Sequence, residues 1–271
     1  MDRQPVMPPF RYFGGKTLMA PTIAELLPEH RHYVEPFAGS LAVLLAKRPS
    51  QQETVNDLDG DLVTFWRVLR DHPEEFQRRA ALTPHSRAEL SAAVELDDAP
   101  DDLERARRVW VRLTQSRSHS MKQTGWKYVR TSGYGARDLD TFVTRMGPIA
   151  ERLRRVSLES RDALDVIRDY GSEPTACLYV DPPYLGSTRA TNYRVEMLDD
   201  DAHRTFADAL MGCRASVVLS GYDSSLYVEL FDGWHRMEVK APTTLSGDTD
   251  RVEVLWSNRP LGEPDLFGGA A

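Results

Sequence analysis

The stretch "CLYVDPPYLG", residues 177 to 186, indicates a buried strand that ends at a carboxylate. Proline has no backbone N–H and a fixed φ, so the two prolines after Asp181 stop the hydrogen-bonded ladder of a sheet. The chain therefore holds a carboxylate, the stiff backbone of Pro182 and Pro183, and the ring of Tyr184 at the carboxyl end of a strand. This order indicates chemistry that needs an acid, a rigid backbone carbonyl and a flat ring held together.

Alternating strand-like and helix-like segments flank this stretch, and they predict an α/β fold with a mainly parallel sheet. Strand patterns cover residues 32–37, 53–57, 156–159, 176–181 and 215–220. Helical patterns cover residues 16–27, 60–71, 138–153, 200–212 and 224–231. Two alternating segments near the end, "WHRMEVKAP" and "RVEVLWSNRP", predict a hairpin whose turn contains Gly247.

Two earlier strands also end in residues suited to a ligand. In "YVEPFAGSLAVLL", residues 33–45, a strand ends at Glu35 and a glycine, Gly39, precedes a helix. A glycine in this turn lets a ligand approach the backbone. In "TVNDLDGDL", Asp57 follows the next strand, where an acid can accept hydrogen bonds from the hydroxyls of a ribose. A second interpretation of Asp57 is that it caps the helix predicted at residue 60.

The composition is that of a globular protein: 41% of the 271 residues are hydrophobic and 28% are charged. We expect no secretory signal and no membrane span, because the apolar run "LAVLLA" at 41–46 is too short to cross a bilayer. The two cysteines form neither a CxxC pair nor a Cys/His cluster, so we expect neither disulfides nor a metal site. This usage is typical of a reducing cytoplasm.

The charge is distributed unevenly along the chain. The formal net charge is −7, yet residues 105–161 contain 14 Lys and Arg against 4 Asp and Glu. One interpretation is that these residues form solvated helix faces. The other is contact with nucleic acid, since Trp110, Trp126, Tyr128 and Tyr134 lie among the basic residues and could stack on bases.

Four motifs follow one another in an order that resembles the DNA adenine methylases of the Dam type, a family that uses S-adenosylmethionine. They are "YFGGK" at 12–16, "VEPFAG" at 34–39, "ND" at 56–57 and "DPPY" at 181–184. The likeness covers nearly the whole chain and includes "RDA" at 161–163, "LSGYDS" at 219–224 and "VEVLWSN" at 252–258. It implies a doubly wound, Rossmann-like sheet of seven strands in the order 3-2-1-4-5-7-6.

The resemblance assigns roles to the residues of "DPPY". The amino group of adenine is a poor nucleophile, and two hydrogen-bond acceptors draw its nitrogen toward tetrahedral geometry. Asp181 and the backbone carbonyl of Pro182, held rigid by Pro183, would be these acceptors, and Tyr184 would stack on the flipped base. Tyrosine favours adenine only modestly, so cytosine-N4 or RNA adenine methylation, or an inactive DNA-binding regulator, are alternatives.

The resemblance also implies a cofactor site for S-adenosylmethionine. Asp57 would hold the ribose, Asp162 the adenine amino group of the cofactor, and Asp181 would face the methionine ammonium. The full predicted set is Tyr12, Phe13, Gly14, Gly15, Lys16, Glu35, Pro36, Phe37, Gly39, Asp57, Asp162 and Asp181.

The sequence departs from the family at two places in or beside this set. The family more often has Trp-Ala at the positions of Tyr12 and Phe13. It commonly has a second glycine at the position of Leu41, where we expect a leucine to narrow the approach of the backbone to the cofactor.

Residues 72–137 interrupt the alternation of strands and helices, with helical patterns at about 74–96 and 101–120. We expect them to form a target-recognition insertion between two catalytic parts, 1–71 and 138–260, followed by a flexible tail, 261–271. The residues expected to bind double-stranded DNA are Arg117, Lys122, Lys127 and Arg130. Residues 113–137 depart from the family, so a recognised sequence such as GATC cannot be carried over. The "DLF" of the tail, residues 265–267, resembles motifs that dock on the sliding clamp.

Overall fold

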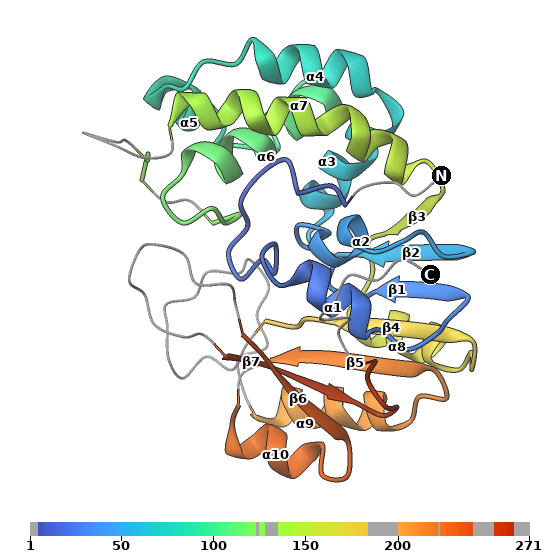
Figure 1. The fold of residues 1–271 in the computed structure, drawn as a ribbon. Helices are drawn as coiled ribbons and strands as arrows, with labels where there is room; N and C mark the ends of the chain where they lie inside the picture. The colour runs from blue at the N-terminus through green and yellow to red at the C-terminus, as the bar shows by residue number, and fades with distance from the viewer. Residues whose placement is uncertain are drawn as a thin grey trace.

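A computed structural model describes residues 5–122, 125–127, 135–183, 200–221, 223–240 and 252–262. Within these ranges the chain forms a seven-stranded sheet in the order β3-β2-β1-β4-β5-β7-β6 (Figure 1). The strands are β1 (His32–Glu35), β2 (Gln52–Asn56), β3 (Val156–Glu159), β4 (Ala176–Val180), β5 (Ser216–Gly221), β6 (His235–Lys240) and β7 (Val252–Ser257). Strands β1 to β5 are parallel, and β7 runs antiparallel to both β5 and β6. The predicted fold class and strand order are confirmed.

Helices cover both faces of this sheet. They are α1 (Ala20–Leu26), α2 (Ala42–Ala46), α3 (Gly60–Asp71), α4 (Pro73–Ala81), α5 (Arg87–Ala92), α6 (Asp102–Gln115), α7 (Ala136–Leu153), α8 (Ala163–Gly171), α9 (Asp200–Met211) and α10 (Ser225–Leu230). Successive residues of a strand point to opposite faces. Accordingly, Tyr33 and Tyr179 belong to one buried core with α1 to α7, and Val34 and Val180 belong to the other with α8 to α10.

Helices α4 to α7 group together near the β3 end of the sheet, at the top of Figure 1. Helix α6 packs against α3 and α5, and α7 packs against α3 and α4. The helical pattern expected at 74–96 is broken into α4 and α5, because Pro84 disfavours helical backbone in the residue before it. Helix α7, which the sequence pattern placed in the second catalytic part, packs on a helix of the predicted insertion.

Side-chain caps fix where several of these helices begin. Asp59 caps α3 by accepting hydrogen bonds from the backbone N–H groups of Asp61 and Leu62. Ser86 and Asp101 cap α5 and α6 in the same way. Each cap satisfies N–H groups that have no partner within the helix, so the sequence sets these starts locally.

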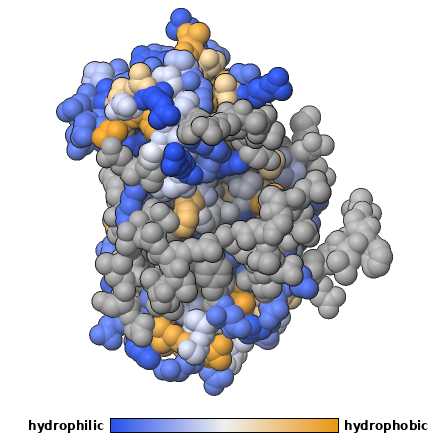
Figure 2. Space-filling view, turned by 90° about the vertical axis from the view of Figure 1, so that its left-hand side faces the viewer, coloured by the Kyte–Doolittle hydropathy of each residue, from blue (hydrophilic) through white to orange (hydrophobic). Residues whose placement is uncertain are grey.

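Figure 2 shows the face of the molecule that lies at the left of Figure 1, and hydrophilic side chains are frequent in its upper part, which corresponds to helices α4 to α7. In the part of the chain that the structure describes, no helix has the length and apolar character to cross a membrane.

Candidate active site at the carboxyl edge of the sheet

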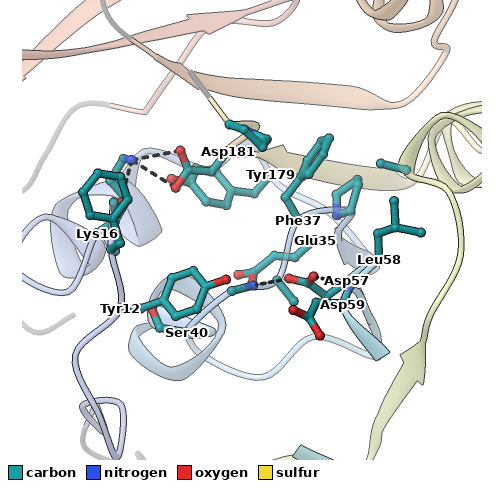
Figure 3. A pocket seen from close by; sticks show the side chains of 18 of the residues that line it. Tyr12, Lys16, Glu35, Phe37, Ser40, Asp57, Leu58, Asp59, Tyr179 and Asp181 are labelled. Atoms are coloured by element: carbon teal, nitrogen blue, oxygen red, sulfur yellow. Dashed lines mark hydrogen bonds and ion pairs between the residues drawn. The ribbon is translucent and has the colours of Figure 1, made fainter. Parts of the chain in front are cut away.

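A pocket of about 390 Å³ opens at the carboxyl ends of the parallel strands (Figure 3). It lies at the point where strand order reverses between β1 and β4, which is where doubly wound sheets bind ligands. All twelve residues of the predicted cofactor set line it: Tyr12, Phe13, Gly14, Gly15, Lys16, Glu35, Pro36, Phe37, Gly39, Asp57, Asp162 and Asp181. The structure thus brings together residues that are up to 169 positions apart in the sequence.

The turn between β1 and α2 contains two residues in left-handed conformation. Gly39 has a φ of +47°, and a Cβ atom there would lie 3.2 Å from the ring of Tyr12, so only glycine leaves this space open. Leu41 has a φ of +56°. Its side chain is fully buried in the core, so the narrowing of the pocket that we expected from a leucine is not seen. Leucine in place of the family's glycine therefore strains the backbone, through the left-handed φ, and does not place a side chain in the pocket.

Asp57 ties that turn to the end of β2. Its two carboxylate oxygens accept hydrogen bonds from the backbone N–H groups of Gly39 and Asp59, each at 2.9 Å. Helix α3 is capped by Asp59, so capping does not explain Asp57. Burial raises the pKa of Asp57 to about 6, against the opposing effect of the two hydrogen bonds.

Glu35 is the second buried carboxylate of the pocket, with 2% of its surface exposed. Its Oε1 atom accepts hydrogen bonds from the hydroxyl of Tyr33, at 2.5 Å, and from the backbone N–H of Leu44, at 2.8 Å. Burial nevertheless raises the pKa of Glu35 to about 7. The site therefore contains two carboxyl groups that change charge near neutral pH.

Asp181, the first residue after β4, is paired with Lys16. The Lys16 ammonium donates to both carboxylate oxygens, at 2.8 and 3.0 Å, and to the carbonyl of Gly14 at 3.2 Å (Figure 3). The ammonium also lies 3.6 Å from Oε1 of Glu253 on β7. The predicted cofactor residue Lys16 thus contacts the predicted catalytic residue directly.

The remaining predicted residues lie as follows. Pro183 lines the pocket, and Pro182 precedes it in the described chain, whereas Tyr184 lies outside the described residues. The ring of Phe37 packs edge-on against Phe206 of α9, with centroids 6.0 Å apart. Asp162 accepts a hydrogen bond from the backbone N–H of Leu164, and so also caps α8.

Several residues of the pocket were not predicted from the sequence. They are Ala38, Ser40, Ala42, Val43, Leu58, Asp59, Ser120, Met121, Ala163, Leu164, Tyr179, Ala202, Thr205 and Phe206. Leu58 carries a signal in the sequence, because it is an apolar residue directly after the predicted ligand residue Asp57, and the structure leaves it 46% exposed. Ser120 and Met121 lie between the predicted DNA-binding residues Arg117 and Lys122, and only the fold brings them to the pocket.

The predicted DNA-binding residues lie in a segment that touches the first motif. Arg117 is exposed, and its backbone pairs with that of Gly125. Lys127 Nζ lies 3.1 Å from His119 Nε2, and burial lowers the pKa of Lys127. The carbonyl of His119 accepts a hydrogen bond from the N–H of Phe13. Lys122 is half-buried, and Arg130 lies outside the described residues.

Many other basic residues of segment 105–161 form ion pairs or hydrogen bonds within the protein. Arg105 pairs with Asp61 at 2.6 Å, and Arg107 pairs with Glu89 and Glu104 at 2.6 and 2.7 Å. Trp110 is fully buried and donates its indole N–H to the carbonyl of Pro9, so it cannot stack on a base. The local charge excess therefore overstates the surface available to DNA, and contact of the segment with nucleic acid stays a prediction.

Fold and pocket together define a class of protein: a doubly wound α/β enzyme whose acidic groups gather where strand order reverses. The family model of the D12 class N6 adenine-specific DNA methyltransferases matches residues 12–245. The chain belongs to this family. It therefore acts on DNA, methylates adenine and requires a methyl donor.

The chain is also similar to individual methyltransferases. The chain is 28% identical over 258 residues to the Type II methyltransferase M1.LlaDCHI of Lactococcus lactis subsp. cremoris, covering 86% of this chain and 87% of the relative. It is 23% identical over 257 residues to the DNA adenine methylase of two Vibrio cholerae strains, covering 87% of this chain and 88% of the relative.

Proposed function

We propose that this adenine methyltransferase uses S-adenosylmethionine as its methyl donor and binds it in the pocket between β1 and β4. The observation that carries the proposal is that one pocket is lined by the whole predicted cofactor set. When bound, this cofactor supplies an electrophilic methyl group on a sulfonium. Gly39 keeps the backbone approachable, Asp57 accepts from the ribose hydroxyls, and Phe37 provides an apolar wall.

The charge of the pocket supports a cationic ligand. Five carboxyl groups line it, those of Glu35, Asp57, Asp59, Asp162 and Asp181, and Lys16 is the only lysine or arginine among its described lining residues. Burial raises the pKa of Glu35 to about 7 and that of Asp57 to about 6. A cationic ligand favours their charged forms. The sulfonium and ammonium groups of S-adenosylmethionine provide such charge.

The target adenine would be held at the end of β4. Asp181 and the Pro182 carbonyl would accept hydrogen bonds from the two hydrogens of its amino group, which increases electron density on the nitrogen as it attacks. Chemistry on a base requires that the base leave the duplex, and Tyr184 would stack on it there. The two prolines reduce the freedom of this corner and so preorganise the acceptors.

We assign sequence-specific contact with double-stranded DNA to the insertion, residues 72–137, between the catalytic parts 1–71 and 138–260. Arg117, Lys122, Lys127 and Arg130 would neutralise phosphates along this contact. A hydrogen bond between the carbonyl of His119 and the N–H of Phe13 supports a direct link between this segment and the cofactor pocket. The Lactococcus relative is named a Type II methyltransferase, so we propose site-specific methylation here as well, in the cytoplasm expected from the sequence.

Expression in a strain without adenine methylation tests the proposal. Sequencing of single DNA molecules should show N6-methyladenine at one short motif in cells with the intact protein and in none with Asp181→Ala. Purified protein should also bind S-adenosylmethionine in a calorimeter. Methylation that appears on cytosine, or that persists in Asp181→Ala, would overturn the assignment.

A further inference from the structure

A lysine ammonium lies between two carboxylates that come from different strands. The Nζ atom of Lys16 is 2.8 and 3.0 Å from the oxygens of Asp181, after β4, and 3.6 Å from Oε1 of Glu253, on β7. Only 4% of the Lys16 side chain and 6% of the Glu253 side chain are exposed. Because buried charges need compensation, these three groups act as one electrostatic unit with a net charge of about −1 when all are ionised.

This arrangement is not the one that the proposed chemistry needs. Asp181 must accept a hydrogen bond from the adenine amino group, yet Lys16 donates to both of its oxygens. A carboxylate that is neutralised by an ammonium stabilises less well the positive charge that develops on the amino nitrogen. Withdrawal of the ammonium from Asp181 would therefore make this carboxylate a stronger acceptor during methyl transfer.

Glu253 lies where it can receive that ammonium. Its Oε1 atom is 3.6 Å from Lys16 Nζ, and the same atom accepts a hydrogen bond from the Ser220 hydroxyl at 2.8 Å. This hydrogen bond holds the carboxylate on β7 in position. A buried carboxylate is costly to keep in a strand that is otherwise apolar from residue 252 to 256, which argues for a role beyond packing.

We propose that Glu253 is a positioning residue that draws the Lys16 ammonium away from Asp181 as the adenine amino group arrives. The proposal rests on the assigned role of Asp181 as the acceptor of that amino group. Glu253 touches neither substrate nor cofactor and acts only through Lys16. The ammonium stays inside the protein throughout, so the local charge remains balanced while Asp181 becomes available.

Three variants change the charge of the unit in a controlled way. Glu253→Gln leaves a net charge of about 0 and holds Lys16 on Asp181. Lys16→Met leaves about −2 and places two carboxylates together without a cation. The double variant restores about −1, the charge of the intact protein. Glu35, Tyr179 and Tyr227 also interact with Asp181, and all three are unchanged in every variant.

Single-turnover methylation at saturating DNA and cofactor measures the effect on the chemical step. We expect Glu253→Gln to slow this step about tenfold, a size common for coupled charged neighbours. Lys16→Met should also slow this step, because it leaves two carboxylates together without a cation. The double variant should be faster than either single variant.

Glu53→Gln is the matched control. Glu53 is also a buried carboxylate in a strand, paired with Lys47 at 2.8 Å and with Arg152, and it lies outside the pocket. Its replacement should lower the unfolding temperature but leave the single-turnover rate of the folded protein unchanged. Ser220→Ala is a milder test, because it keeps the Glu253 charge and removes only its hydrogen bond. It should slow the step by a smaller factor than Glu253→Gln.

Two results would overturn the proposal. One is a single-turnover rate in Glu253→Gln equal to that of the intact protein. The other is a double variant whose loss equals the product of the two single losses, since independent residues give that result. Absence of methylation by the intact protein is a different outcome, because it contradicts the proposed function and not the role of Glu253.

Discussion

Asp57, the proposed ribose ligand, would set the pH range of cofactor binding. Burial raises its pKa to about 6, and ribose hydroxyls would donate to it fully only when it is ionised. The pKa lies above the usual value, so the charged form is lost as pH falls through about 6. We expect affinity for S-adenosylmethionine to weaken about tenfold between pH 7 and pH 5, measured by calorimetry.

Variants separate this effect from that of Glu35, whose pKa is about 7. Asp57→Asn should bind weakly and lose the break in affinity near pH 6, whereas Glu35→Gln should keep it. A flat affinity profile in the intact protein, or a break that survives in Asp57→Asn, would be inconsistent with the assignment of Asp57.

Leu41 stores backbone strain in the turn between β1 and α2. A non-glycine residue in left-handed conformation costs roughly 1–2 kcal/mol, and its buried side chain compensates by packing. Both Leu41→Ala and Leu41→Gly remove the packing, but only glycine also removes the strain. We therefore expect Leu41→Gly to be more stable than Leu41→Ala by about 1 kcal/mol in urea unfolding.

This order is the reverse of that at ordinary positions, where glycine is less stable than alanine by roughly 0.5–1 kcal/mol. Leu44, a fully buried neighbour within α2, provides the reference: Leu44→Gly should be less stable than Leu44→Ala. The same order at both positions would show that Leu41 carries no strain.

Secondary-structure elements were predicted best where local signals suffice. The parallel strands were found because buried runs end at prolines or polar residues, and α3 was found because Asp59 and the apolar spacing define it. Helix α8 was missed, since its nine residues follow directly on Asp162, which the sequence marked only as a ligand residue. Helix α6 ends at Gln115, before the expected residue 120, because Ser116 forms a β-bridge with Trp126.

The same distinction between local and long-range signals applies to the residues of the candidate site. Residues such as Glu35, Asp57 and Asp181 could be predicted, because the ends of parallel strands meet at one edge whatever the loops do. Glu253 could not be predicted, because it lies on the antiparallel strand β7 and its partner, the Lys16 ammonium, comes 237 positions earlier in the chain.

The four predicted DNA-binding residues should carry a measurable share of DNA affinity. Replacing Arg117, Lys122, Lys127 and Arg130 with Ala should reduce the slope of log affinity against log salt by roughly one unit for each phosphate that is no longer neutralised. We expect Lys127 to contribute least, because burial already lowers its pKa and it lies beside His119. Arg168→Ala and Arg204→Ala, exposed residues on α8 and α9, serve as controls. An unchanged slope in the quadruple variant would place the DNA contact elsewhere.

At the scale of the whole molecule, the end of the described chain returns to α1. The N–H of Gly262 donates to the carbonyl of Leu26 at 3.2 Å. A chain ending at Gly262 keeps this hydrogen bond, so we expect it to methylate a short duplex at the rate of the full chain. The "DLF" motif at 265–267 lies outside the described residues. Docking on the sliding clamp stays a prediction, and equal recovery of both chains in a clamp pull-down would reject it.

The measurement that tests the account most directly compares Asp181→Ala with Tyr184→Ala on DNA carrying 2-aminopurine at the target. The fluorescence of this base rises when it leaves the stack, and single-turnover methylation of the adenine substrate reports the chemical step. Asp181→Ala should keep the rise and lose roughly a hundredfold to a thousandfold in methylation rate. Tyr184→Ala should lose much of both, since stacking of an unpaired base is worth about 1–3 kcal/mol. Substantial methylation by Asp181→Ala would contradict the assignment of the carboxyl end of β4 as the catalytic site.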